Sequence, residues 1–127
     1  MSDSKTKSAF KSARVFKTDW FAKAAKKAGI DDEQLCKAFG QILLDQVDDL
    51  GGGVFKKRLN RNLHRSILCG KSKTIWVFVY LYAKSDRKNI EDDELKGFRQ
   101  LADLISSKSN GDLQKDLDSG VLVEICT

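Results

Sequence analysis

The segment from Thr74 to Lys84, TIWVFVYLYAK, constrains the fold more than any other part of the chain. It is rich in β-branched and aromatic residues, which favour strands. By simple alternation, one face would carry Ile75, Val77, Val79 and Leu81, and the other Trp76, Phe78, Tyr80 and Tyr82. A strand that is apolar on both faces is typical of the centre of a sheet covered on both sides. The segment therefore predicts a central strand between two layers of other structure.

Two shorter strands are expected just before this one. After Gly51-Gly52-Gly53 the apolar period changes from the helical value to two, and residues 54–59 alternate in the manner of a strand. A turn near Arg61-Asn62 leads into a second strand that ends at Cys69. Because the connections are short, the three strands are predicted to form an antiparallel meander.

The residues before the glycine run predict a short strand followed by a helical hairpin. Residues 13–17 read as a strand, and Thr18 or Asp19 can cap a helix that ends at Gly29. Its apolar positions are Trp20, Phe21, Ala24, Ala25 and Ala28. Asp31 with Gln34 three residues later forms a capping-box pattern, which predicts a second helix running to about Asp49.

The residues after the long strand predict two helices and a last strand. Asn89 can cap a helix whose acidic first turn complements the helix dipole and whose apolar positions would dock on the sheet. A short helix ending at Gly120 and a strand over residues 121–125 complete the order β-α-α-β-β-β-α-α-β. This order predicts an α+β fold: an antiparallel sheet made of the meander plus the terminal strands, an N-terminal helical hairpin and C-terminal helices. Residues 1–12 are expected to be a flexible segment, and 13–127 a single domain.

The composition favours a cytoplasmic protein without a metal or cofactor. The N-terminus shows no secretion signal, and the longest apolar run is too short for a membrane helix. Cys36, Cys69 and Cys126 are an odd number at wide spacings, which predicts three reduced thiols. His64 is the only histidine, so we expect no metal site.

The positive charge of the chain is concentrated in one stretch. Residues 50–84 hold eight of the 23 Lys and Arg residues and none of the 18 Asp and Glu residues. These cations are Lys56, Lys57, Arg58, Arg61, Arg65, Lys71, Lys73 and Lys84. A basic stretch of this kind, alternating onto a sheet face, indicates a surface that binds phosphate groups of a nucleic acid. The alternative is a set of solvated strand lysines.

Four blocks of the chain carry a family resemblance: LGGGVFKKRL, YLYAKSDRKNI, EDDELKGFRQLA and GVLVEI. They resemble the RelE-type toxins, and more narrowly their bacterial GGGV-KKRL branch in the RelE/HigB-like superfamily. The resemblance runs from about Val15 to Ile125. It implies a small RelE-like domain that is the toxin of a type II toxin-antitoxin system. Such toxins are typically endoribonucleases that cut mRNA in the ribosomal A site without a metal, inhibiting translation and arresting growth. The implied partners are a cognate antitoxin, mRNA and the ribosome, with the toxin a monomer or a hetero-oligomer with its antitoxin.

The resemblance also suggests which residues form the site. Its two alternating strand cations fall on Lys56 and Arg58, the cation of the next strand falls on Arg65, and a further basic group falls on Lys84 or Arg87. The tyrosine that some RelE enzymes use has no direct match, since its position falls on Ile90 or Glu91, and Tyr82 is the candidate substitute. The small-residue turn usual in this branch is replaced by Asn62-Leu63-His64.

RNA cleavage by transesterification requires a base, an acid and cationic donors for the developing phosphorane charge. Arginine can supply bidentate donors, and histidine ionises near neutral pH. The predicted catalytic residues are Lys56, Arg58, His64, Arg65 and Tyr82, and the predicted RNA-binding residues are Lys57, Arg61, Lys84 and Arg87. Among the aromatic residues of the long strand, only Tyr82 is expected to reach a ligand, while Trp76 and Phe78 are expected beneath the helix that follows Asn89.

Two other functions fit the same residues. One is a non-catalytic RNA- or partner-binding regulatory module, which the altered turn at residues 62–64 favours. The other is a gyrase poison like the ParE toxins, which would need no RNA-cleaving groups.

Overall fold

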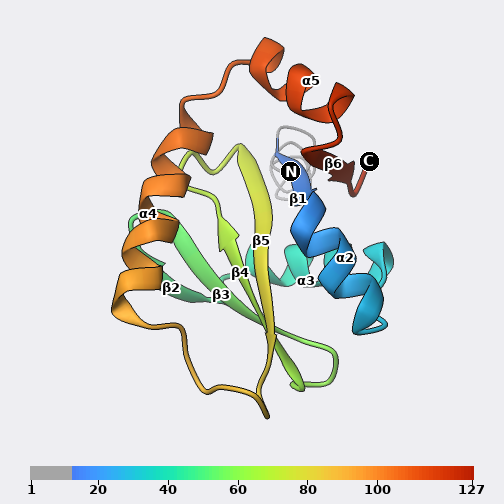
Figure 1. Ribbon diagram of the computed structural model, residues 1–127, viewed down its shortest axis with the longest axis vertical. Helices are drawn as coiled ribbons and strands as arrows, with labels where there is room; N and C mark the ends of the chain where they lie inside the picture. Colours follow the sequence, from blue (N-terminus) through green and yellow to red (C-terminus); the bar gives the residue numbers. More distant parts are fainter. Residues whose placement is uncertain (1–12) are drawn as a thin grey trace, which may run out of the picture.

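The structure, a computed structural model, describes residues 13–127 and shows one six-stranded sheet with helices on both faces (Figure 1). The elements are β1 (Arg14–Thr18), α2 (Asp19–Lys27), α3 (Asp32–Ile42), β2 (Asp48–Gly51), β3 (Val54–Leu59), β4 (His64–Cys69), β5 (Ile75–Ala83), α4 (Asp92–Ser106), α5 (Asn110–Asp118) and β6 (Leu122–Ile125). The predicted α+β class is therefore confirmed. The prediction for residues 1–12 lies outside the described residues.

The strands lie in the order β2-β3-β4-β5-β1-β6. The predicted meander is present as β3, β4 and β5, and β6 pairs antiparallel with β1. β1 pairs with β5 in parallel, which places the N-terminal strand beside the long strand. β5 is thus covered by a strand on each edge and by helices on each face, as its apolar composition predicts.

One strand, β2, is absent from the sequence prediction, which extends the second helix to about Asp49. That helix ends at Ile42, and Asp45 has a left-handed backbone with φ of 63°. β2 is a short, mostly exposed edge strand with two aspartates, so it lacks the apolar alternation by which strands are recognised. The turn that follows β2 requires glycine. A Cβ on Gly53, whose φ is +83°, would lie 2.8 Å from Lys71 Cα.

Helix starts agree with the predictions for α2 and α3 but not for α4. Thr18 accepts a hydrogen bond from the backbone N–H of Phe21, and Asp31 and Gln34 form the predicted capping box. The N-cap of α4 is Glu91, whereas the sequence predicts Asn89 at this position. The Glu94 carboxylate accepts a hydrogen bond from the Glu91 backbone N–H at 2.8 Å. The charged first turn therefore starts the helix without help from Asn89.

The core has two layers, one on each face of the sheet. The first lies beneath α2 and α3 and includes Trp76 and Phe78, so the prediction that these two residues lie beneath α4 is wrong. The second lies beneath α4 and α5 and includes Val77 and Ala102. Trp20, predicted to share the buried face of its helix, is 52% exposed.

A β-bulge in β5 changes which residues share a face. Ile67 pairs with Tyr80 and the next residue, Leu68, pairs with Phe78, so Val79 is an extra residue on β5. Tyr80 and Tyr82 consequently pack with the α4 layer, while Leu81 joins the layer beneath α2 and α3. Simple alternation is correct up to Val79 and wrong from Tyr80 onward.

The cysteine prediction is correct for one residue of three. Cys69 is buried with a free thiol, but Cys36 and Cys126 form a disulfide with their Cα atoms 5.4 Å apart. Their separation of 90 residues gives no local signal of the pairing. β6 runs beside β1 and brings Cys126 back to α3, so the pairing depends on the folded chain. No helix among residues 13–127 is long and apolar enough to cross a membrane.

Candidate functional site

Three of the predicted site residues form a row across three adjacent strands. Arg58 on β3 pairs with Arg65 on β4, which pairs with Tyr82 on β5. Paired residues of antiparallel strands share a face, so the three side chains lie on the α4 face of the sheet. A second row, Lys56, Ile67 and Tyr80, lies on the same face, two residues along each strand from Arg58, Arg65 and Tyr82. Tyr82 reaches this row only because of the bulge at Val79, since regular alternation would place it with Phe78 on the other face.

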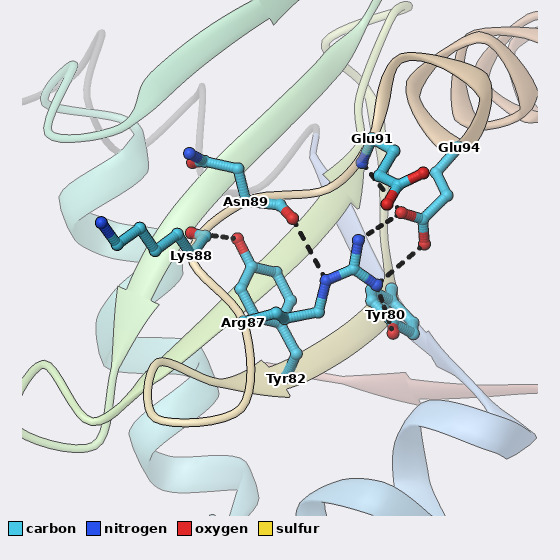
Figure 2. Close-up of polar contacts among 7 residues, drawn as sticks. All are labelled: Tyr80, Tyr82, Arg87, Lys88, Asn89, Glu91 and Glu94. Carbon is cyan, nitrogen blue, oxygen red and sulfur yellow. Dashed lines mark hydrogen bonds and ion pairs between the residues drawn. The ribbon is translucent and has the colours of Figure 1, made fainter.

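The loop between β5 and α4 brings Arg87 to the same row (Figure 2). The Arg87 guanidinium lies over the Tyr82 ring, 5.6 Å from its centroid, and Nη1 lies 3.4 Å from the Tyr80 hydroxyl. Glu94 on α4 forms an ion pair with this guanidinium, and Nε donates to the Asn89 carbonyl at 3.1 Å. Four contacts thus fix the orientation of Arg87.

The structure separates the two candidates for the distal basic group by their surroundings. Arg87 contacts Tyr80 and Tyr82 directly. Lys84 follows β5, and its backbone N–H donates to the Leu63 carbonyl at 2.9 Å, which ties the end of β5 to the β3–β4 turn.

The ionisation of the site reflects burial and the ion pair. Burial raises the pKa of the Tyr82 phenol, and this effect outweighs the opposing charges of Arg65 and Arg87. The Arg87 hydrogen bond lowers the pKa of Glu94, and the same bond raises the pKa of Arg87. At neutral pH the Tyr82 phenol is therefore protonated. Its hydroxyl donates a hydrogen bond to the Lys88 carbonyl at 3.5 Å.

Lys56 has polar neighbours that the basic stretch alone does not indicate. Its Nζ donates to Asn89 Oδ1 at 3.2 Å and lies 3.9 Å from a carboxylate oxygen of Asp48. Asp48 comes from β2, where it pairs with Lys56 across the strands. Lys56, Arg58 and Asp48 line a shallow pocket of about 280 Å³. The Lys56 ammonium is thus held between a carboxylate and an amide instead of among cations only.

Arg65 is 8% exposed, and its contacts explain the form of the β3–β4 turn. Its Nη1 donates to the carbonyl oxygens of Asn62 and His64, at 3.0 and 3.2 Å. Residues 60–62 all have positive φ, between 52° and 70°, a conformation that asparagine tolerates better than most residues. The turn that departs from the family pattern is therefore fastened by the predicted site arginine itself.

Three of the predicted residues lie away from the row. His64 pairs with Leu59, which belongs to the opposite layer, and its Nδ1 lies 3.2 Å from Asn60 Nδ2. Lys57 is buried on that opposite face and donates to the Gln46 carbonyl at 2.9 Å. Burial, followed by the charge of Arg58, lowers the pKa of Lys57. Arg61 is at the exposed tip of the turn, beside a second pocket of about 290 Å³ that Arg58 also lines.

Sequence reasoning misses Tyr80, Asn89 and Glu94, which contact predicted site residues, and Trp20, which contacts Tyr80. Alternation places Tyr80 on the face of Tyr82 without predicting a ligand contact for it. Asn89 and Glu94 are predicted only as residues at the start of a helix, and Trp20 only as an apolar position of its helix. In the structure Trp20 stacks on Tyr80 with ring centroids 5.1 Å apart. The acidic first turn of α4 directly after a basic loop was the signal available for Glu94.

Groups of three or more potential metal ligands are absent from residues 13–127. A family model described as the RelE toxin of the RelE / RelB toxin-antitoxin system matches residues 13–125. No curated protein and no solved structure matches the chain.

Proposed function

Because the chain belongs to the RelE toxin family of toxin-antitoxin systems, we propose that it is an endoribonuclease that cuts mRNA on the ribosome without a metal ion. As a toxin of such a system it has an antitoxin as its partner. The observation that carries the proposal is the row of Arg58, Arg65 and Tyr82 across three strands, with Arg87 held over Tyr82.

The row supplies the charge that the reaction needs. When the 2′-oxygen attacks the neighbouring phosphorus and the bond to the 5′-oxygen breaks, negative charge develops on the phosphorane oxygens. Arg58, Arg65 and Arg87 offer guanidinium donors from one face, and Arg87 and Arg65 are held by contacts before any ligand binds. Preorganised donors of this kind stabilise a transition state more than mobile ones.

Two groups at the row can carry protons. Tyr82 is protonated at neutral pH, so we assign it the proton that the departing 5′-oxygen must receive. The neutral amine form of Lys56 is the candidate to accept the proton of the attacking 2′-hydroxyl and become an ammonium, because Lys56 lies on the same face, two residues from Arg58 along β3. The products would be a 2′,3′-cyclic phosphate and a free 5′-hydroxyl.

A non-catalytic binding module remains the second candidate function. The observation that favours it is the commitment of Arg65 Nη1 to two backbone carbonyls of the altered turn. In that case the basic face would bind RNA or a partner without cleaving it.

Primer extension on ribosome-bound mRNA tests the proposal. The wild-type chain should produce cuts within codons, and Arg58→Ala and Arg65→Ala should each reduce the cutting rate by at least tenfold. Lys26→Ala, which removes one positive charge from the exposed surface of α2, is the matched control and should cut at the wild-type rate. Arg58 is exposed and Arg65 is buried, so the Arg58 variant keeps the test valid if loss of Arg65 disturbs the turn.

Expression of the chain without its antitoxin separates the candidate functions. Growth arrest with cut mRNA supports the nuclease, and arrest with DNA damage supports a gyrase poison. No arrest supports the binding module. Equal cutting by wild type, Arg58→Ala and Arg65→Ala would contradict the assignment of the row.

A further inference from the structure

We propose that Trp20 and Tyr80 form a stacking platform that binds an unpaired base of the RNA strand next to the row of Arg58, Arg65 and Tyr82. The proposal rests on the proposed function, because it names a subsite for the same ligand class. Trp20 and Tyr80 are both outside the set of residues that the sequence suggested for the site.

The exposure of Trp20 is the first observation. Trp20 is 52% exposed, whereas Trp76, the second tryptophan, is 3% exposed. One face of the Trp20 ring stacks on Tyr80, at 5.1 Å between centroids and 22° between planes. Large aromatic residues usually bury most of their area, so an exposed tryptophan held in a fixed orientation is a potential contact surface for a ligand.

The position of the stack relative to the row is the second observation. Tyr80 connects Trp20 to the site, since its ring lies 5.9 Å from the Tyr82 ring and its hydroxyl lies 3.4 Å from Arg87 Nη1. Phe98 on α4 packs against Tyr80 at 5.8 Å, which supports the ring from the helix side. The path from Tyr82 through Tyr80 to Trp20 has centroid steps of 5.9 and 5.1 Å, and stacked nucleotides rise by about 3.4 Å each, so about three nucleotides cover it.

The surrounding charge indicates which ligand would occupy the stack. Arg87 adjoins both tyrosines, and Arg65 and Arg58 continue the row on the neighbouring strands. Glu94, the acid nearest Arg87, is neutralised by its ion pair with that residue. Cations that bind phosphates beside an aromatic ring that binds a base are the two elements of single-strand RNA recognition. An unpaired RNA base fits this combination better than an apolar peptide, because RNA brings phosphates to the guanidinium groups and an apolar peptide brings no negative charge.

Binding of a non-cleavable RNA provides the test. The probe is a fluorescent, 2′-O-methylated single-stranded oligonucleotide, and binding to the full chain is measured by anisotropy. Trp20→Ala should weaken binding roughly 5- to 150-fold, the range expected for losing one stacked base. Trp20→Phe should retain most of the affinity because phenylalanine also offers a ring face. Leu44→Ala, which truncates another large exposed apolar residue, is the matched control and should bind as wild type.

A second oligonucleotide series shows whether the binding free energy lost in the Trp20→Ala variant comes from contact with a base. Abasic sites are placed at each position in turn, and the affinities of wild type and Trp20→Ala are compared. If the platform binds a base, one abasic position should abolish the difference between the two proteins. A Trp20→Ala effect that persists with every abasic probe overturns the proposal.

The outcomes distinguish failure of this inference from failure of the proposed function. Unchanged RNA binding by Trp20→Ala, together with weakened binding by Arg58→Ala, overturns the platform and leaves the nuclease intact. Absence of mRNA cutting by wild type, together with a base-dependent loss of binding by Trp20→Ala, refutes the nuclease and supports the platform in a binding module. Absence of any RNA binding by wild type overturns the platform.

Discussion

Reduction of the disulfide between Cys36 and Cys126 is expected to remove a large part of the stability of this domain. The bond joins α3 to the residue after β6 and closes a loop with a sequence separation of 90 residues. Because the folded chain already places the two Cα atoms 5.4 Å apart, the main effect of the bond is to restrict the unfolded chain.

The magnitude follows from the length of that loop. In the chain-entropy model a loop of this length removes about 15.5 cal/mol/K from the unfolded state, which is about 4.6 kcal/mol at 25 °C. Domains are typically stable by about 5 to 15 kcal/mol, so reduction would remove roughly 30% or more of the free energy of unfolding. With a urea m-value of about 1 to 3 kcal/mol/M, the unfolding midpoint should fall by roughly 1.5 to 4.5 M.

Urea unfolding followed by circular dichroism, with and without reductant, measures this change. Cys36→Ala is the matched control, because it lacks the bond and its midpoint should not respond to reductant. The oxidation state is checked by titrating thiols in urea, where one reactive thiol is expected without reductant and three with it. In the folded protein the remaining thiol should not react, since burial raises the pKa of Cys69 to about 12.

Two results would refute this reasoning. Three reactive thiols in the unreduced, air-exposed protein would show that the bond does not form. A reductant-induced loss below about 1 kcal/mol, with the bond confirmed, would show that the unfolded chain is not restricted by the loop as the entropy model requires.

Three further predictions follow from the charged contacts. Glu94→Gln should leave RNA affinity equal or higher but reduce the cutting rate, because the acidic partner that orients Arg87 over Tyr82 is lost; anisotropy and primer extension measure the two effects separately. The hydrogen bond from Arg14 lowers the pKa of Glu124 in the folded protein. The pair therefore stabilises the fold fully above the unfolded-state pKa of glutamate, about 4.3. This stabilisation is lost as the pH falls through the lower pKa of Glu124 in the folded state. Glu124→Gln should therefore be less stable than wild type at pH 7 and equal to it near pH 2 in urea unfolding. Arg58→Ala should reduce the slope of log affinity against log salt for single-stranded RNA by about 0.7, as expected for one lost phosphate contact in a salt titration.

The elements and the charged strands of the domain were predictable because their signals are local. The resemblance to the RelE-type toxins singled out Arg58 and Arg65 among the cations of the basic stretch, and the structure pairs these two residues. Alternation and capping residues located the strands of the meander and the starts of α2 and α3. These patterns depend on neighbours within a few residues, and local sequence records such neighbours directly.

The remaining features depend on residues that are distant in the chain. β2 carries no apolar alternation and forms only as an edge partner of β3. The bulge at Val79 arises from the register between β4 and β5, and it alone moves Tyr80 and Tyr82 to the face of Arg65. Trp20 is placed on Tyr80 by the path from β1 into α2, so helical periodicity could not show that it lies outside the core.

The sequence by itself determined the α+β class, the central β5 and the strands that carry Arg58 and Arg65, because periodicity and capping act over short distances. Only the tertiary structure decided which face each half of β5 presents, which loop arginine reaches Tyr82 and which cysteines are joined. The physical reason is that strand register and loop docking are set by packing between segments tens of residues apart. A one-residue shift in register moves every later side chain to the other face of the sheet.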